Sequence, residues 1–164
     1  MSDNATLTLS LAEVTRNDLG IAGGKAANLG ELVHSNFPVP KGFVVTTAAY
    51  NSFLESSGLK DLISKSLSKV DYLDYESIEK TAETIQQGIA ERQLPASIIS
   101  EIKKMYDQLN CKSVAVRSSA TAEDLPAASF AGQYESFLNI KDAQQVRFCE
   151  EMLRFFMVRT SAIV

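Results

Sequence analysis

A stretch of very small residues between two β-rich segments constrains the fold of this chain most strongly. Residues 113–117 read SVAVR, an apolar segment that ends in Arg117, and residues 134–140 read YESFLNI, in which polar and apolar side chains alternate. These patterns predict two strands that close a hairpin-like flap. The connection between them begins with SSATA and reaches Gly132, so its backbone can come close to another group.

The same stretch is a candidate anion site. Arg117 at a strand end supplies a fixed cation, and small residues with hydroxyl groups expose N–H and O–H donors, which together suit an oxyanion such as a phosphate chain. The alternative is an ordinary solvated loop that follows a surface or ion-paired arginine. The loop alone does not decide between these interpretations, so a second element is needed.

A second candidate anion site lies near the N-terminus. The run Gly23-Gly24-Lys25 precedes AANLGELVH, in which Leu29, Leu32 and Val33 recur at helical spacing and give one apolar face. The predicted helix start therefore combines two glycines and a lysine with the positive end of the helix dipole. It is not a Walker A loop, because the GxxxxGK[ST] spacing is absent and Ala26 replaces the Ser or Thr. A glycine turn with a solvated lysine is the alternative.

Three segments together resemble the N-terminal region of the pyruvate phosphate dikinase and phosphoenolpyruvate synthase family. They read GGKAANLGEL, FPVPKGFVVTTAAYNSFL and VAVRSSATAEDLPAASFAGQYESFLNI. The resemblance extends over almost the whole chain in the order and spacing of the family. The resemblance implies an α+β fold over residues 1–164. It would be the first portion of an ATP-grasp-like nucleotide-binding domain, with a mixed or antiparallel sheet flanked by helices.

The resemblance also implies the nucleotide-binding residues. Lys25 and Arg117 match the positions that contact ATP phosphates in the family, Gly132 matches one that lines the nucleotide through its backbone, and Ser136 one that does so through its hydroxyl group. Neither a catalytic residue nor a metal ligand is expected in this chain. Neutral donors of lower rank are Ser118, Ser119 and Thr121.

The reaction implied by the family is a phosphoryl relay. ATP passes its β-phosphoryl group to a histidine on a separate domain, phosphate is released to water, and the phosphohistidine converts pyruvate to phosphoenolpyruvate. The resemblance places the Mg²⁺ ligands, the carrier histidine and the pyruvate-binding barrel beyond residue 164. The chain alone is therefore expected to bind ATP weakly at best and not to turn over pyruvate. The alternatives are a non-catalytic nucleotide-binding remnant and the equivalent domain of a rifamycin phosphotransferase.

Composition narrows the possible partners and the location. The 16 basic and 20 acidic residues give a net charge of −4 without a basic run, which argues against nucleic-acid binding. Cys111 and Cys149 form no CxxC pair, and His34 is the single histidine, so a structural zinc site is not expected. Because the sequence has neither a signal peptide nor a stretch of about 20 apolar residues, we expect a cytoplasmic protein without a membrane span.

Periodicity predicts the remaining elements. Strands are expected at 7–11 and 43–45, and helices at 25–35, at 59–67, from Thr46 or Thr47 to 56, from 75 to 91, and from Pro95 to 109. A last helix is expected from 142 to the end of the sequence. Its run FFMV at 155–158 predicts self-association or complementation by a missing segment, unless the helix folds back and buries these side chains.

Overall fold

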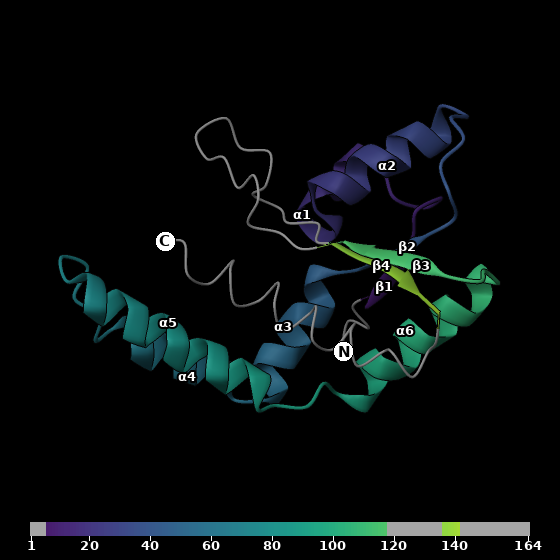
Figure 1. The fold of residues 1–164 in the computed structure, drawn as a ribbon. Coiled ribbons are helices and arrows are strands. Elements are labelled where there is room, and N and C mark those ends of the chain that lie inside the picture. Colours follow the sequence, from purple (N-terminus) through teal and green to yellow (C-terminus); the bar gives the residue numbers. More distant parts are fainter. Residues whose placement is uncertain (1–5, 118–135, 142–164) are drawn as a thin grey trace, which may run out of the picture.

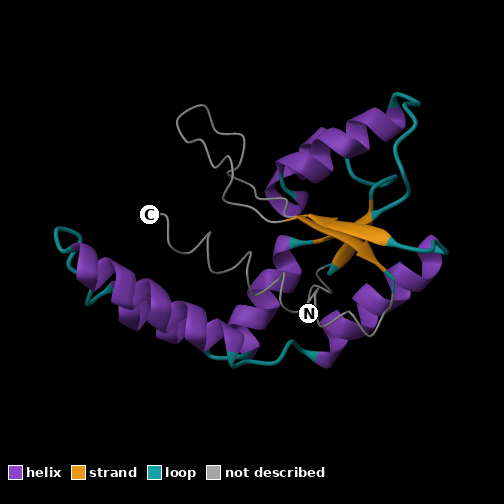
Figure 2. Cartoon of the chain, in the orientation of Figure 1, coloured by secondary structure: helices purple, strands orange, loops and turns teal. Residues whose placement is uncertain are grey.

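The computed structural model describes residues 6–117 and 136–141. Helices surround a central group of short strands, as Figures 1 and 2 show. This arrangement confirms the predicted α+β class. In chain order the described elements are β1 (Thr8–Ser10), the 3-10 helix η1 (Arg16–Asp18), α1 (Leu19–Ala22), α2 (Gly24–His34), β2 (Phe43–Val45), α3 (Thr47–Ser56), α4 (Leu59–Leu67), α5 (Tyr75–Ala90), α6 (Ala96–Leu109), β3 (Val114–Arg117) and β4 (Ser136–Ile140).

The described strands form two antiparallel pairs. In the first pair Thr8 of β1 lies opposite Val45 of β2. In the second pair β3 and β4 form the predicted hairpin, with Arg117 opposite Ser136 and an irregular register between Val114 and Val116. The predicted antiparallel pairing is therefore confirmed, whereas assignment to the ATP-grasp fold stays a prediction.

Side-chain caps explain where two of the helices begin. The Thr46 hydroxyl accepts a hydrogen bond from the N–H of Ala49 at 3.4 Å and donates one to the carbonyl of Thr6 at 2.6 Å, so it caps α3 and ties it to the chain before β1. The Asp74 carboxylate accepts the N–H of Glu76 at 3.0 Å and caps α5. The predicted start of α3 at Thr46 and Thr47 is confirmed.

The larger hydrophobic core is formed mainly by α3 to α6, and we call it the helical cluster. Isoleucines at helical spacing in α5 and α6 supply Ile85, Ile89, Ile98 and Ile102, all of which are buried. These faces of α5 and α6 are therefore packing surfaces. The other buried members of the helical cluster are Ala49, Phe53, Leu59 and Leu94.

A smaller core, which we call the N-terminal cluster, buries Val14, Ala22, Ala26 and Val44. It lies on the other side of the β1–β2 pair. Side chains alternate along β2, so Phe43 and Val45 pack against the helical cluster while Val44 between them packs in the N-terminal cluster. The β1–β2 pair thus packs against a hydrophobic core on each of its two faces.

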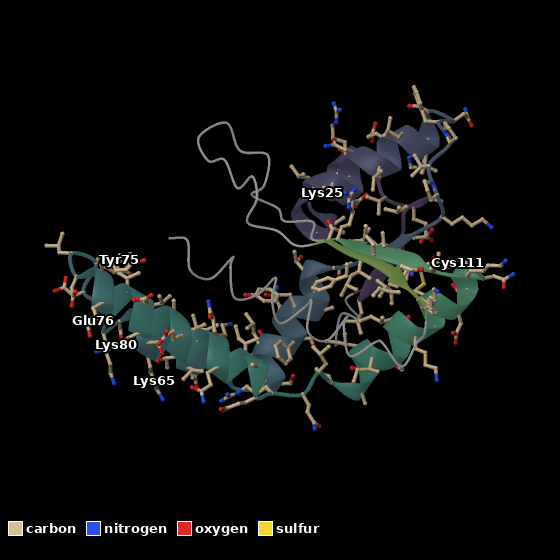
Figure 3. All side chains as sticks on the ribbon, in the orientation of Figure 1. Lys25, Lys65, Tyr75, Glu76, Lys80 and Cys111 are labelled. Carbon is tan, nitrogen blue, oxygen red and sulfur yellow. The ribbon has the colours of Figure 1, made fainter. Side chains whose placement is uncertain are left out.

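Helices α4 and α5 pack against each other and project from the rest of the chain as an arm (Figure 1). Hydrogen bonds order the connection at its tip, because the Leu73 N–H donates to Asp71 Oδ1 at 3.0 Å and the Asp71 N–H donates to Ser77 Oγ at 2.9 Å. Large side chains are nevertheless exposed there, with Leu73 98% accessible. Tyr72 and Tyr75 are exposed as well, and Figure 3 labels Tyr75 at the tip.

The packing of α2 differs from the sequence-based expectation. Its buried residues are Gly24, Ala26, Ala27 and Gly30, all of them small. Leucines of the predicted apolar face lie on the outside instead, since positions 29 and 32 are 37% and 40% exposed. Small residues let a helix approach a neighbouring backbone more closely than leucines would, and this close approach determines which face is buried.

Candidate nucleotide site

The glycines before Lys25 form a break between two helices. Gly23 has φ +80° and ψ 166°, a backbone conformation open to glycine and strained for other residues. Its N–H donates to the carbonyl of Leu19 at 3.0 Å and so closes α1, while its own carbonyl accepts the N–H of Ala27 at 3.0 Å and opens α2. The GGK run therefore begins a helix, as predicted, with Lys25 as its second residue.

The surroundings of Lys25 are more enclosed than the sequence suggested. Gly23 and Gly24 are both buried, and Lys25 is half-buried. The neighbouring Ala26 packs in the N-terminal cluster with Val44 of β2. The glycines therefore serve close packing as well as the backbone break, and Lys25 lies at the α1 end of α2 (Figure 3).

The hairpin of β3 and β4 brings Arg117 and Ser136 together. Arg117 is the last residue of β3 and Ser136 the first of β4, and the Arg117 Nε–H donates to Ser136 Oγ at 3.4 Å. Both residues are exposed. A guanidinium carries five N–H donors, and this bond takes one of them, so an oxyanion beside this end of the hairpin, from which residues 118–135 continue, could also be bound.

The other predicted site residues lie outside the described residues. These are Gly132 and, of lower rank, Ser118, Ser119 and Thr121. Lys25 is on α2, and its neighbour Ala26 packs against β2 of the β1–β2 pair. Arg117 and Ser136 belong to the separate β3–β4 pair. That both cations bind one nucleotide stays a prediction.

The histidine and the described cysteine both lie at the surface. His34 is exposed in the last turn of α2, and Cys111 is an exposed free thiol (Figure 3). Within residues 6–117 and 136–141, His, Cys, Asp and Glu side chains form no group of three or more that could hold a metal ion. No helix in the described part of the chain has the length and apolar character needed to cross a membrane. Cys149 lies outside the described residues.

The turn formed by residues 15–18, which the sequence did not lead us to expect, is hydrogen-bonded to α2. Thr15 precedes η1, and both its N–H and its hydroxyl donate to the Asp18 carboxylate at 2.8 Å. The Arg16 N–H donates to Glu31 Oε1 of α2, also at 2.8 Å. The spacing Thr-x-x-Asp is close to a known signature of helix starts and could have indicated this turn.

Taken together, the described residues define an α+β domain with one predicted site cation, Lys25, at a helix start and another, Arg117, at the end of β3 beside β4. Comparison with known families gives a match over residues 19–157 to the family described as "Pyruvate phosphate dikinase, AMP/ATP-binding domain". The chain belongs to this family. Its predicted membership is therefore confirmed, and so is the binding of an adenine nucleotide as the function of the matched domain.

Curated relatives carry the name phosphoenolpyruvate synthase. The chain is 46% identical over 138 residues to a probable phosphoenolpyruvate synthase of Staphylothermus marinus, an alignment that covers 79% of this chain and 16% of the relative. It is 44% identical over 146 residues to the phosphoenolpyruvate synthase of Pseudomonas aeruginosa, which covers 84% of this chain and 18% of the relative. The chain therefore spans less than a fifth of the length of these two proteins.

Proposed function

We propose that this chain is the first part of the nucleotide-binding region of a phosphoenolpyruvate synthase and binds ATP for a phosphoryl relay completed by other domains. The names of the relatives support this assignment over a rifamycin phosphotransferase. The single observation that carries the site is the pairing of Arg117 with Ser136, which lie opposite each other where β3 ends and β4 begins. This pairing brings two residues that are 19 positions apart to the same spot, as a shared ligand would require.

Each proposed residue has a distinct task toward the triphosphate. Arg117 would bind phosphate oxygens through its planar fork of donors, and Ser136 would hold that guanidinium in place and offer its own hydroxyl group. Lys25 would add a point charge at the positive end of α2. Gly132 would let the backbone of the flap approach the phosphates. Helix and hairpin would thus bind the same chain of phosphates.

The rest of the relay is assigned to protein outside residues 1–164. In the proposed enzyme, Mg²⁺ would neutralise charge on the phosphates, and its carboxylate ligands would come from the remainder of the nucleotide-binding domain. The histidine that carries the phosphoryl group and the pyruvate site would lie on further domains. The proposal includes a cytoplasmic location, which the exposed free thiol of Cys111 supports. Self-association through residues 155–158 stays a prediction on residues outside the described part.

Calorimetric titration with MgATP tests the proposal. We expect weak binding by the wild-type chain and no measurable binding by Arg117→Ala, because the variant lacks the bidentate donor. Lys103→Ala is the control, since Lys103 is an exposed cation of α6, and it should bind as wild type does. Equal affinity of Arg117→Ala and wild type would show that the ligand assignment is wrong. Conversion of pyruvate by the purified chain alone would contradict the assignment of the relay chemistry to other domains.

A further inference from the structure

The contact between α2 and the segment before η1 is closer than any side chain would allow. Gly30 is buried in the middle of α2. A β-carbon built on Gly30 would overlap with the carbonyl oxygen of Val14 and lie 2.8 Å from its carbonyl carbon. Both neighbours are backbone atoms, which cannot rotate away as a flexible side chain would. The depth at which α2 packs is therefore limited at Gly30 by the backbone of Val14.

The next residue of α2 holds the helix to the same turn. Glu31 accepts the N–H of Arg16 at 2.8 Å through Oε1, and Arg16 is the first residue of η1. The turn is itself fixed, because Asp18 accepts two hydrogen bonds from Thr15. Two contacts therefore hold α2 against the segment that contains η1. Gly30 packs closely on the backbone of Val14, and Glu31 accepts a hydrogen bond from Arg16.

This docking determines the orientation of Lys25. Successive residues of an α-helix are separated by about 100° around its axis, so the rotation that buries Gly30 and Ala26 also sets the direction of Lys25. Lys25 shares its side of the helix with Leu29 and Leu32, both of which are exposed, while the small residues are buried. A rotation of α2 by one residue would change which of these side chains faces the core.

We infer that Gly30 and Glu31 are positioning residues, which hold α2 against η1 so that Lys25 is presented to the nucleotide phosphates. The inference rests on the proposed role of Lys25. Neither residue is expected to touch ATP. Each acts through the rotation and depth of the helix that carries the lysine, and an error of about 1 Å in such a position can cost up to a hundredfold in function.

Glutamate substitutions provide the sharper test, because Gly30→Ala could prevent folding. Glu31→Ala removes the acceptor of the Arg16 N–H, whereas Glu31→Gln keeps an oxygen at the same place. Glu101→Ala is the matched control, since Glu101 is a half-buried helical glutamate that pairs with Lys104 on α6 at 3.3 Å. Two quantities are measured well below the melting temperature: the affinity for MgATP and the hydrogen exchange of amides 25–30.

We expect Glu31→Ala to bind MgATP about tenfold more weakly than wild type and to exchange faster at amides 25–30. Glu31→Gln and Glu101→Ala should match wild type in both measurements. Unchanged exchange in Glu31→Ala would overturn the inference, and so would faster exchange with unchanged affinity. A lack of MgATP binding by wild type, or full binding by Lys25→Ala, would instead count against the proposed function. In those cases the exchange data alone decide whether Glu31 docks α2.

Discussion

At the scale of single residues, Gly23 has a conformation that other amino acids avoid. Its φ of +80° with ψ of 166° lies in a region nearly reserved for glycine, and the break it makes separates α1 from α2. We expect Gly23→Ala to lower the free energy of unfolding by about 1–3 kcal/mol. Gly20→Ala is the control, since Gly20 lies within α1 with open space around it, and alanine there should be neutral or stabilising. Urea denaturation measures both.

A second residue-scale prediction concerns acid stability. Hydrogen bonds from the Thr15 backbone and hydroxyl group lower the pKa of Asp18 below its ordinary value of 3.8. Folding therefore favours the carboxylate, and the stabilisation is fully present above the pKa of the unfolded state and lost as the pH falls through the lowered pKa. The melting temperature of wild type should exceed that of Asp18→Asn at neutral pH, and the difference should shrink below about pH 4.

Replacement of another aspartate controls for the loss of one negative charge. Asp107→Asn removes a carboxylate from the exposed surface of α6. A difference between wild type and Asp18→Asn that stays constant from neutral pH to pH 2, or one that Asp107→Asn reproduces, would show that the Thr15 hydrogen bonds do not stabilise the charged form.

At the scale of elements, local signals predicted most of the fold. Thr46 capped its helix as its type suggests, and the sequence pattern indicated helices where α5 and α6 lie. The short elements η1 and α1 were missed, because three- and four-residue helices are too short to have a period. The prediction for α2 placed the leucines on the buried face, because leucine is more hydrophobic than glycine or alanine. The structure buries the glycines and alanines instead. The approach of Gly30 to Val14 depends on tertiary structure, which no local pattern reports.

The candidate site was predictable only in part. The strand pattern indicated the hairpin and so the proximity of Arg117 and Ser136, and the glycines indicated the helix start at Lys25. Their assignment to ATP came from family resemblance, because basic residues beside small ones occur in many surface loops. The support of α2 by Glu31 was not foreseen, since its partner is a backbone N–H in a turn that the sequence analysis did not identify.

The arm contains two large apolar residues that are similar in hydrophobicity but differ in burial. Ile89 at the base of the arm is fully buried, whereas Leu73 at its tip is almost fully exposed. We expect Ile89→Ala to cost about 2–5 kcal/mol of unfolding free energy and Leu73→Ala to change it by less than about 0.5 kcal/mol. Chemical denaturation of the two variants measures this contrast. Similar losses in both would mean that the tip packs against the chain in solution.

At the scale of the whole molecule, the two hydrophobic clusters need not open together. Among residues 6–117 and 136–141, the helical cluster has eight buried members and the N-terminal cluster four, with β1 and β2 between them. Because smaller cores bury less apolar area, the N-terminal cluster should open at a lower free energy than the helical cluster. Native-state hydrogen exchange should therefore give lower protection for amides of α2 than for those of α6.

A variant in each cluster separates the two units. Val14→Ala should accelerate exchange in α2 with little effect on α6, because Val14 is fully buried in the N-terminal cluster. Ile102→Ala removes a buried side chain of the helical cluster and should accelerate exchange in α6. If Val14→Ala accelerates exchange equally in both helices, the chain unfolds as one cooperative unit.

The exposed end of the arm also has a practical consequence. Leu73 is exposed in the connection between α4 and α5, which lies at the far end of the arm from the elements that carry Lys25 and Arg117 (Figure 1). A fluorophore or short affinity peptide attached at this position would leave the proposed ligand contacts untouched. The tip is therefore a suitable handle for fixing the domain to a sensor surface while nucleotide solutions flow over it.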